Sequence, residues 1–162
     1  MKKKILKLLT KKNLNNRIFH YPLHEDALSK EDLVEGFKVL ASRQLTMSKK
    51  TREFEEYFKK KLNLNYCLMV NSGSSANLLA FQALINPYRK KRLSPNDEVL
   101  VATLSWPTSF WPIVQSNLKP VFVDVDQNLN INPDEIQKKI TTKTKAILLV
   151  HFTGRSCDMD RI

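Results

Sequence analysis

Short apolar runs alternate with amphipathic stretches along the carboxyl-terminal half of the chain. The runs at residues 98–102, 120–124 and 145–150 have the length and aliphatic content of strands. Helices are expected between them, over residues 109–115 and 133–140, and the second opens with a proline. Strands that alternate with helices pair in parallel through right-handed crossovers. The pattern therefore predicts an α/β fold with a mostly parallel sheet flanked by helices. The run at 145–150 is expected to be buried on both faces.

Two helices are expected earlier in the chain. Ser29 and Asp32 have the spacing of a capping box, and a helical apolar face follows them. Thr51 is expected to cap a second helix, whose apolar residues recur at spacings of three and four. The short apolar run at residues 66–70 then predicts a further buried strand.

A loop of small residues joins that expected strand to another helix. Gly73 lets the backbone approach a ligand closely, and Ser74 and Ser75 offer hydroxyls beside the first N–H groups of the helix. This arrangement favours an anion cradle, with phosphate as the anion. The alternative is an ordinary helix start, capped by Ser72 or Ser74, with no ligand. The stretch alone does not decide between the two.

Composition and charge exclude several functions. The 162 residues are 42% hydrophobic and 27% charged, as in a soluble globular domain or part of one. Of the net charge of +11, residues 1–17 supply seven Lys or Arg and no acid, and residues 89–92 form another basic run. A basic lead-in and one loop are typical of solvated surface, so nucleic-acid binding is not expected. No apolar run could span a bilayer and no signal-peptide cleavage site follows the lead-in, so we expect a cytoplasmic chain without a membrane partner.

The metal-ligating residue types lack a metal-site pattern. Cys67 and Cys157 lie far apart, and His20, His24 and His151 have no ligand spacing. We therefore expect two reduced thiols and no metal.

Candidate chemistry gathers at the carboxyl ends of the expected strands, where open α/β sheets bind ligands. The loops there are residues 72–76, 103–109 and 124–128. Trp106, in the second loop, could supply a flat face for an aromatic ring beside the cradle. Together these features indicate a site for a phosphorylated planar cofactor. The alternative for Trp106 is a half-buried packing residue.

These segments resemble the DegT/StrS family of pyridoxal-phosphate (PLP) sugar aminotransferases, over about residues 20–162. Residues 21–23, 45–47 and 51–55 also look similar, and they suggest a branch that includes nucleotide-sugar 3-dehydratases and lipopolysaccharide-biosynthesis members. The matching motifs lie in the family's order at residues 71–79, 104–106, 120–126, 144–147 and 158–160. Two positions depart from the family pattern. Ala102-Thr103 stands where Pro-Ala is frequent, and Ser48 stands where Gly is frequent.

The resemblance implies the amino-terminal part of the large domain of a fold type I PLP enzyme, with residues 1–17 as a flexible lead-in and 18–162 as the partial domain. It implies that Gly73, Ser74 and Ser75 hold the cofactor phosphate and that Trp106 stacks on its ring. Residues 124–126 and His151 would lie near the floor of the active site, with turn capping and loop packing as their alternatives.

The implied activity is transamination of a nucleotide-linked keto-sugar for surface polysaccharide or lipopolysaccharide synthesis, with glutamate as amino donor, in a homodimer. A nucleotide-sugar 3-dehydratase is the alternative. In the family, the Asp that contacts the pyridine nitrogen and the Lys that binds the cofactor covalently, or the His of dehydratases, come later in the chain. No catalytic residue is therefore assigned within these 162 residues. The sequence is expected to be an amino-terminal fragment, and a catalytically inactive truncated product is a further alternative.

Overall fold

The computed structural model describes residues 27–162 and divides the chain into two compact units, one ending at Met69 and one running from Val70 to Ile162. The expected basic lead-in, residues 1–17, lies outside the described residues. Each unit is described by itself.

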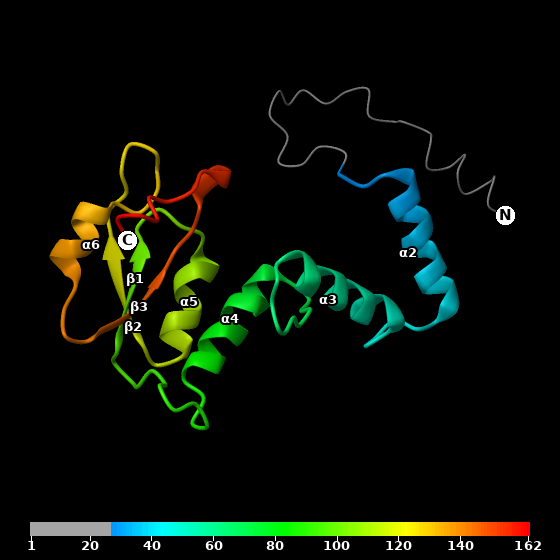
Figure 1. The fold of residues 1–162 in the computed structure, drawn as a ribbon, viewed down its shortest axis with the longest axis horizontal. Coiled ribbons are helices and arrows are strands. Elements are labelled where there is room, and N and C mark those ends of the chain that lie inside the picture. Colours follow the sequence, from blue (N-terminus) through cyan, green and yellow to red (C-terminus); the bar gives the residue numbers. More distant parts are fainter. Residues whose placement is uncertain (1–26) are drawn as a thin grey trace. The chain divides into compact units, whose positions relative to one another are not determined.

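The first unit contains helices α2 (Lys30–Ser42) and α3 (Lys49–Lys61) (Figure 1). The predicted capping box is confirmed, because the Asp32 amide donates to Ser29 Oγ while the Ser29 amide donates to the Asp32 carboxylate. The predicted cap of α3 is wrong, since Ser48 precedes the helix and Thr51 lies inside it. A Thr in the first turn can imitate a cap signal, and the helical geometry simply extends further back.

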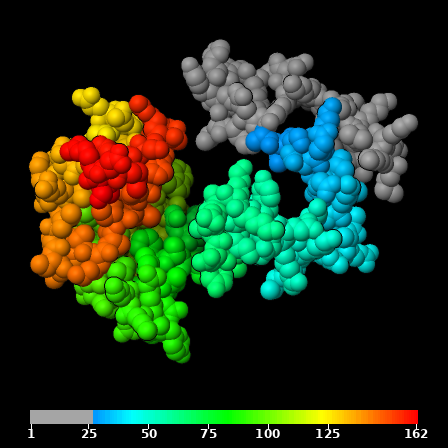
Figure 2. Space-filling view, viewed as in Figure 1, coloured from blue at the N-terminus to red at the C-terminus, as the bar shows by residue number. Residues whose placement is uncertain are grey.

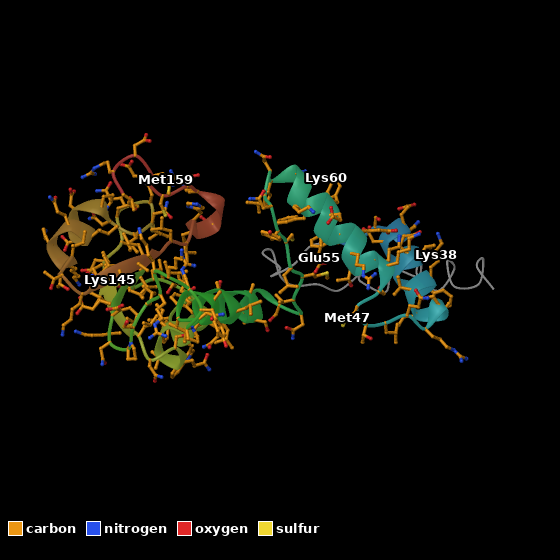
Figure 3. All side chains as sticks on the ribbon, turned by 60° about the horizontal axis from the view of Figure 1, so that its bottom comes forward. Lys38, Met47, Glu55, Lys60, Lys145 and Met159 are labelled. Atoms are coloured by element: carbon orange, nitrogen blue, oxygen red, sulfur yellow. The ribbon has the colours of Figure 1, made fainter. Side chains whose placement is uncertain are left out.

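The strand predicted at residues 66–70 is also wrong. Within the described residues this segment joins no ladder, and Tyr66 is 89% exposed. The Met69 amide instead donates to Glu55 Oε1 on α3 at 2.8 Å; Figure 3 labels Glu55. An apolar run becomes a strand only where its N–H and C=O groups meet a partner strand.

The second unit is built on a parallel sheet, as predicted. Strands β1 (Glu98–Ala102), β2 (Lys119–Val123) and β3 (Thr144–Leu148) lie in the order β2-β1-β3. The central strand β1 is buried along its whole length, whereas β3 is only partly buried, contrary to expectation. Each outer strand pairs with β1, and β3 has no second partner strand within the described residues.

Helices cover both faces of this sheet. Helices α4 (Gly73–Leu84) and α5 (Pro107–Gln115) lie on one side, and α6 (Pro133–Lys139) lies on the other (Figure 1). Alternation along β1 explains the two layers. Val99 and Val101 pack with Ile113 of α5, while Leu100 packs with Ile136 of α6.

The last residues close the α6 side of the sheet. Figure 2 shows them in red against the orange region that contains α6. Buried Asn130, 3% exposed, donates through Nδ2 to the carbonyls of Arg155 and Ser156 and accepts from the Phe152 amide through Oδ1. The segment after β3, which includes the short 3₁₀ helix η1 (Phe152–Gly154), is thereby fixed to the β2–α6 connection.

A charged group is buried at the opposite, amino-terminal edge of the sheet. Glu98 is 5% exposed, and its carboxylate accepts from the Thr141 hydroxyl at 2.6 Å and from Lys119 Nζ at 3.0 Å. The Thr141 hydrogen bond first, and then the Lys119 ammonium, hold the pKa of Glu98 below its usual value. This cluster joins β1 to β2 and to the segment just before β3, at the edge of the sheet opposite the candidate site.

Among residues 27–162, no helix has both the length and the apolar character required to cross a membrane.

Candidate functional site

The start of α4 combines a cap with unused hydrogen-bond donors. Ser72 Oγ accepts from the Ser75 amide at 3.2 Å, and the Ser72 carbonyl accepts from the Ala76 amide at 3.0 Å. Within the described part of the chain, the amides of Gly73 and Ser74 and the Ser74 hydroxyl have no protein partner. The Ser72 cap that an ordinary helix start would have is therefore present. It leaves two N–H groups and one hydroxyl at the start of α4 without a partner among the described residues.

Gly73 occupies a position where the fold itself does not require glycine. It is the first residue of α4, its φ is not positive, and a Cβ added there would meet no atom within 4 Å. Alanine is the better helix former by about 1 kcal/mol. The missing side chain leaves open space directly over the free amides, which is the space a bound anion would fill.

The three predicted phosphate-binding residues are not equivalent. Ser75 is committed to the cap through its amide, and its hydroxyl accepts from Ser72 Oγ at 3.1 Å. Ser74 has both of its donors free among the described residues. The geometry thus favours Gly73 and Ser74 as direct anion donors, with Ser75 holding the turn that presents them.

Trp106 lies in the loop that leaves the carboxyl end of β1. It is the residue before α5 and is 74% exposed, more than the half-buried packing alternative predicted. Two hydrogen bonds from residues just before Trp106 anchor the loop to the sheet. The Thr103 hydroxyl donates to the Val123 carbonyl at 2.9 Å, and the Ser105 hydroxyl donates to the Ala102 carbonyl at 3.1 Å.

The two candidate loops are connected through the helices that follow them. Asn77 Nδ2 on α4 donates to the Thr108 carbonyl on α5 at 3.2 Å. Beside this contact is an open cavity of about 520 Å³. Its lining comes from the first turns of α4 and from one face of α5: Ser74, Ser75, Leu78, Thr108, Trp111, Pro112 and Gln115.

The sequence analysis missed the roles of Asn77 and Trp111. Trp111, on α5, is 52% exposed and lines this cavity. Pro112 was the available signal, because a proline inside a helix leaves a carbonyl four residues earlier without its usual donor. That carbonyl belongs to Thr108, the partner of Asn77.

The acidic residues after β2 and the histidine after β3 have structural partners. Asp126 Oδ1 accepts from the Asn128 amide at 2.7 Å and from the Asn130 amide at 3.2 Å, which is turn capping. His151 Nδ1 accepts from the Cys157 amide at 3.0 Å. Residues 27–162 hold no cluster of three or more metal-ligating side chains.

These observations define the class of protein domain. The second unit is an α/β domain with a candidate anion site at a helix start and an exposed tryptophan at the carboxyl edge of a parallel sheet. Residues 26–162 match the family model described as the DegT/DnrJ/EryC1/StrS aminotransferase family. The chain belongs to this family.

Individual relatives agree with this assignment. GDP-4-keto-6-deoxy-D-mannose 3-dehydratase of Escherichia coli O55:H7 is 36% identical over 146 residues, covering 90% of this chain and 37% of that protein. A crystal structure of GDP-4-keto-6-deoxymannose-3-dehydratase with a trapped PLP–glutamate geminal diamine matches with a TM-score of 0.81 and 36% identity, over 87% of this chain and 36% of that one. The Helicobacter pylori aminotransferase PseC, involved in pseudoaminic acid biosynthesis, matches with a TM-score of 0.76 and 27% identity, over 88% and 37% of the two chains.

The predicted family and the predicted fold type I architecture are thus confirmed. The chain spans little more than a third of the length of these relatives, 37% for the Escherichia coli dehydratase.

Proposed function

We propose that the second unit holds the phosphate of PLP at the start of α4, as part of an enzyme that acts on a nucleotide-linked sugar. The observation that carries this proposal is that the Gly73 and Ser74 amides have no protein partner among the described residues, at a position where a Cβ added to Gly73 would meet no atom within 4 Å. A helix start with unused N–H groups attracts phosphate through both hydrogen bonds and the helix dipole.

Each residue of the site has one task in this proposal. The Gly73 and Ser74 amides and the Ser74 hydroxyl donate to the phosphate, which fixes one end of the cofactor. Trp106 offers its exposed face to the pyridine ring and keeps water from that side. When bound, PLP supplies an electron sink for the bonds around the amino-bearing carbon.

Two reactions on a sugar are compatible with this site. The dehydratase alternative is supported by 36% identity to two sequences of GDP-4-keto-6-deoxymannose 3-dehydratase, compared with 27% for the aminotransferase PseC. Transamination, the activity that the sequence analysis expected first, is equally a candidate, since the family is described as one of aminotransferases. In either reaction glutamate is the proposed amino donor, and the PLP–glutamate structure of the relative supports that choice. Assembly as a homodimer and a cytoplasmic location remain predictions.

Replacing Gly73 tests the phosphate site directly. Gly73→Leu places a bulky side chain at the start of α4, and its Cβ would meet no atom within 4 Å, so we expect the fold to tolerate it. Gly36→Leu is the matched control, because Gly36 lies inside α2 and also has nothing within 4 Å of an added Cβ. The probe is pyridoxamine 5′-phosphate (PMP), which carries ring and phosphate and needs no covalent bond to a lysine. Binding is measured by isothermal titration of the full chain.

We expect the wild type and Gly36→Leu to bind PMP equally and Gly73→Leu to lose at least tenfold in affinity. Inorganic phosphate should compete with PMP in the wild type. The phosphate-site proposal is wrong if Gly73→Leu binds PMP as well as the wild type does, or if the wild type binds no PMP.

A further inference from the structure

Two side-chain hydrogen bonds connect α4 to α5. At the amino-terminal ends of the helices, Asn77 Nδ2 donates to the Thr108 carbonyl at 3.2 Å. Further along, Gln82 Nε2 donates to Ser116 Oγ, also at 3.2 Å. Both are partly buried, and each joins residues more than 30 positions apart in the sequence. The two bonds differ in their acceptors, which are a backbone carbonyl of α5 in the first and a side-chain hydroxyl in the second.

The Asn77 bond supplies a hydrogen-bond donor that α5 itself lacks. In an α-helix, the carbonyl of Thr108 would accept from the amide of residue 112. Residue 112 is a proline and has no N–H, so the helix cannot satisfy this carbonyl in the usual way. A partly buried carbonyl without a donor is costly, and Asn77 supplies the donor from the neighbouring helix. The Gln82 bond, in contrast, joins two side chains that α5 does not require for its backbone.

Thr108 is also close in sequence and structure to the proposed ring-stacking residue. Trp106 directly precedes α5, and its carbonyl accepts from the amide of Ser109 at 2.8 Å within the first turn. Ser109 is buried, which fixes this turn against the sheet. The Thr108 carbonyl and Trp106 thus belong to the same turn, and Asn77 connects that turn to α4.

We propose that Asn77 is a positioning residue that holds Trp106 at a fixed place relative to the phosphate donors of α4. The inference rests on the proposed function, because it assigns Trp106 and the start of α4 to one ligand. Asn77 touches neither the ring nor the phosphate in this account. It acts through the Thr108 carbonyl and the first turn of α5.

The test compares Asn77→Leu with Gln82→Leu in the full chain, using PMP and inorganic phosphate as separate probes. Leucine matches asparagine in size and favours the helix, so α4 should persist. Asn77→Leu should lower the affinity for PMP about tenfold, because Trp106 is then no longer held in place before the ligand binds. It should leave the affinity for inorganic phosphate within about twofold, because the Gly73 and Ser74 amides do not depend on it. Gln82→Leu should change neither affinity.

The inference is overturned if Asn77→Leu binds PMP normally, if Gln82→Leu loses as much, or if phosphate affinity falls together with PMP affinity. The indole N–H signals of Trp106 and Trp111 give a second readout without ligand. Asn77→Leu should shift them and Gln82→Leu should not, and unmoved signals in Asn77→Leu also overturn the inference. Should Asn77→Leu fail to fold, Asn77→Ala removes the donor with a smaller side chain. Failure of the proposed function shows itself separately, as a wild type that binds neither probe.

Discussion

The bond between Asn77 and the α5 carbonyl can be examined through stability, independently of any ligand. The perturbation is a double-mutant cycle that combines Asn77→Leu with Pro112→Ala. Alanine at position 112 restores the N–H that the proline lacks, so the helix can satisfy the Thr108 carbonyl internally. In that background the Asn77 donor is no longer needed. The effects of the two substitutions on the free energy of unfolding should therefore not be additive.

The structure sets the size of the expected effects. Asn77→Leu in the wild-type background leaves a partly buried carbonyl without a donor and should cost about 1–2 kcal/mol of unfolding free energy. Pro112→Ala gains helix propensity of up to about 3 kcal/mol. It loses buried ring carbons at about 0.8 kcal/mol each, and it frees the unfolded chain. In the Pro112→Ala background, Asn77→Leu should cost less than about 0.5 kcal/mol, which makes the coupling about 1 kcal/mol.

Urea unfolding followed by tryptophan fluorescence is the suitable assay. The sequence has two tryptophans, and both Trp106 and Trp111 lie at α5, so the signal reports on the second unit alone. Four proteins are compared: the wild type, the two single variants and the double variant. Equal costs of Asn77→Leu in the two backgrounds would refute the reasoning, because the donor would then serve something other than the carbonyl that Pro112 leaves free.

Three further predictions concern the frame that carries the site. Ile113→Ala, at a residue that is fully buried against the sheet, should lower the unfolding free energy by about 2–5 kcal/mol in urea, while Ile113→Val costs about 1 kcal/mol; a loss for Ala no larger than for Val would contradict its core role. Glu98→Gln should be less stable than the wild type at pH 7. This difference should shrink as the pH falls through the lowered pKa of Glu98, since the carboxylate stabilises the fold only while ionised; a pH-independent difference would argue against this. Asn130→Leu should accelerate hydrogen exchange at the Phe152 amide, which donates to Asn130 Oδ1 at 3.0 Å. Unchanged protection of this amide would show that another contact holds the segment.

Much of the second unit could be predicted from local pattern. The strand at residues 98–102 has the predicted bounds, and the other two strands begin one residue earlier than expected. These runs are dense in aliphatic residues and are bounded by turns or prolines, so local preference and burial agree. The helix at 133–140 was found for the same reason, because Pro133 at the first position gives an unambiguous start.

The failures share a physical cause: they depend on partners that are distant in the sequence. Residues 66–70 have the composition of a strand, but a strand also requires a neighbouring ladder, and the Met69 amide is used by Glu55 instead. The same limit applies to Asn77, whose partner lies 31 residues further on. The sequence identified the small-residue loop and Trp106 as candidates. It could not show that the Ser75 amide is used by the cap while the Gly73 and Ser74 amides have no partner within residues 27–162.

The central claim, that the amides at the start of α4 bind phosphate, can be measured at a single atom. The chain has three glycines, Gly36, Gly73 and Gly154, so selective ¹⁵N-glycine labelling yields three amide signals in one spectrum. On titration with PMP, the account predicts that the Gly73 signal moves and saturates while the Gly36 and Gly154 signals stay in place. A Gly73 signal that remains fixed while PMP binds would contradict the account.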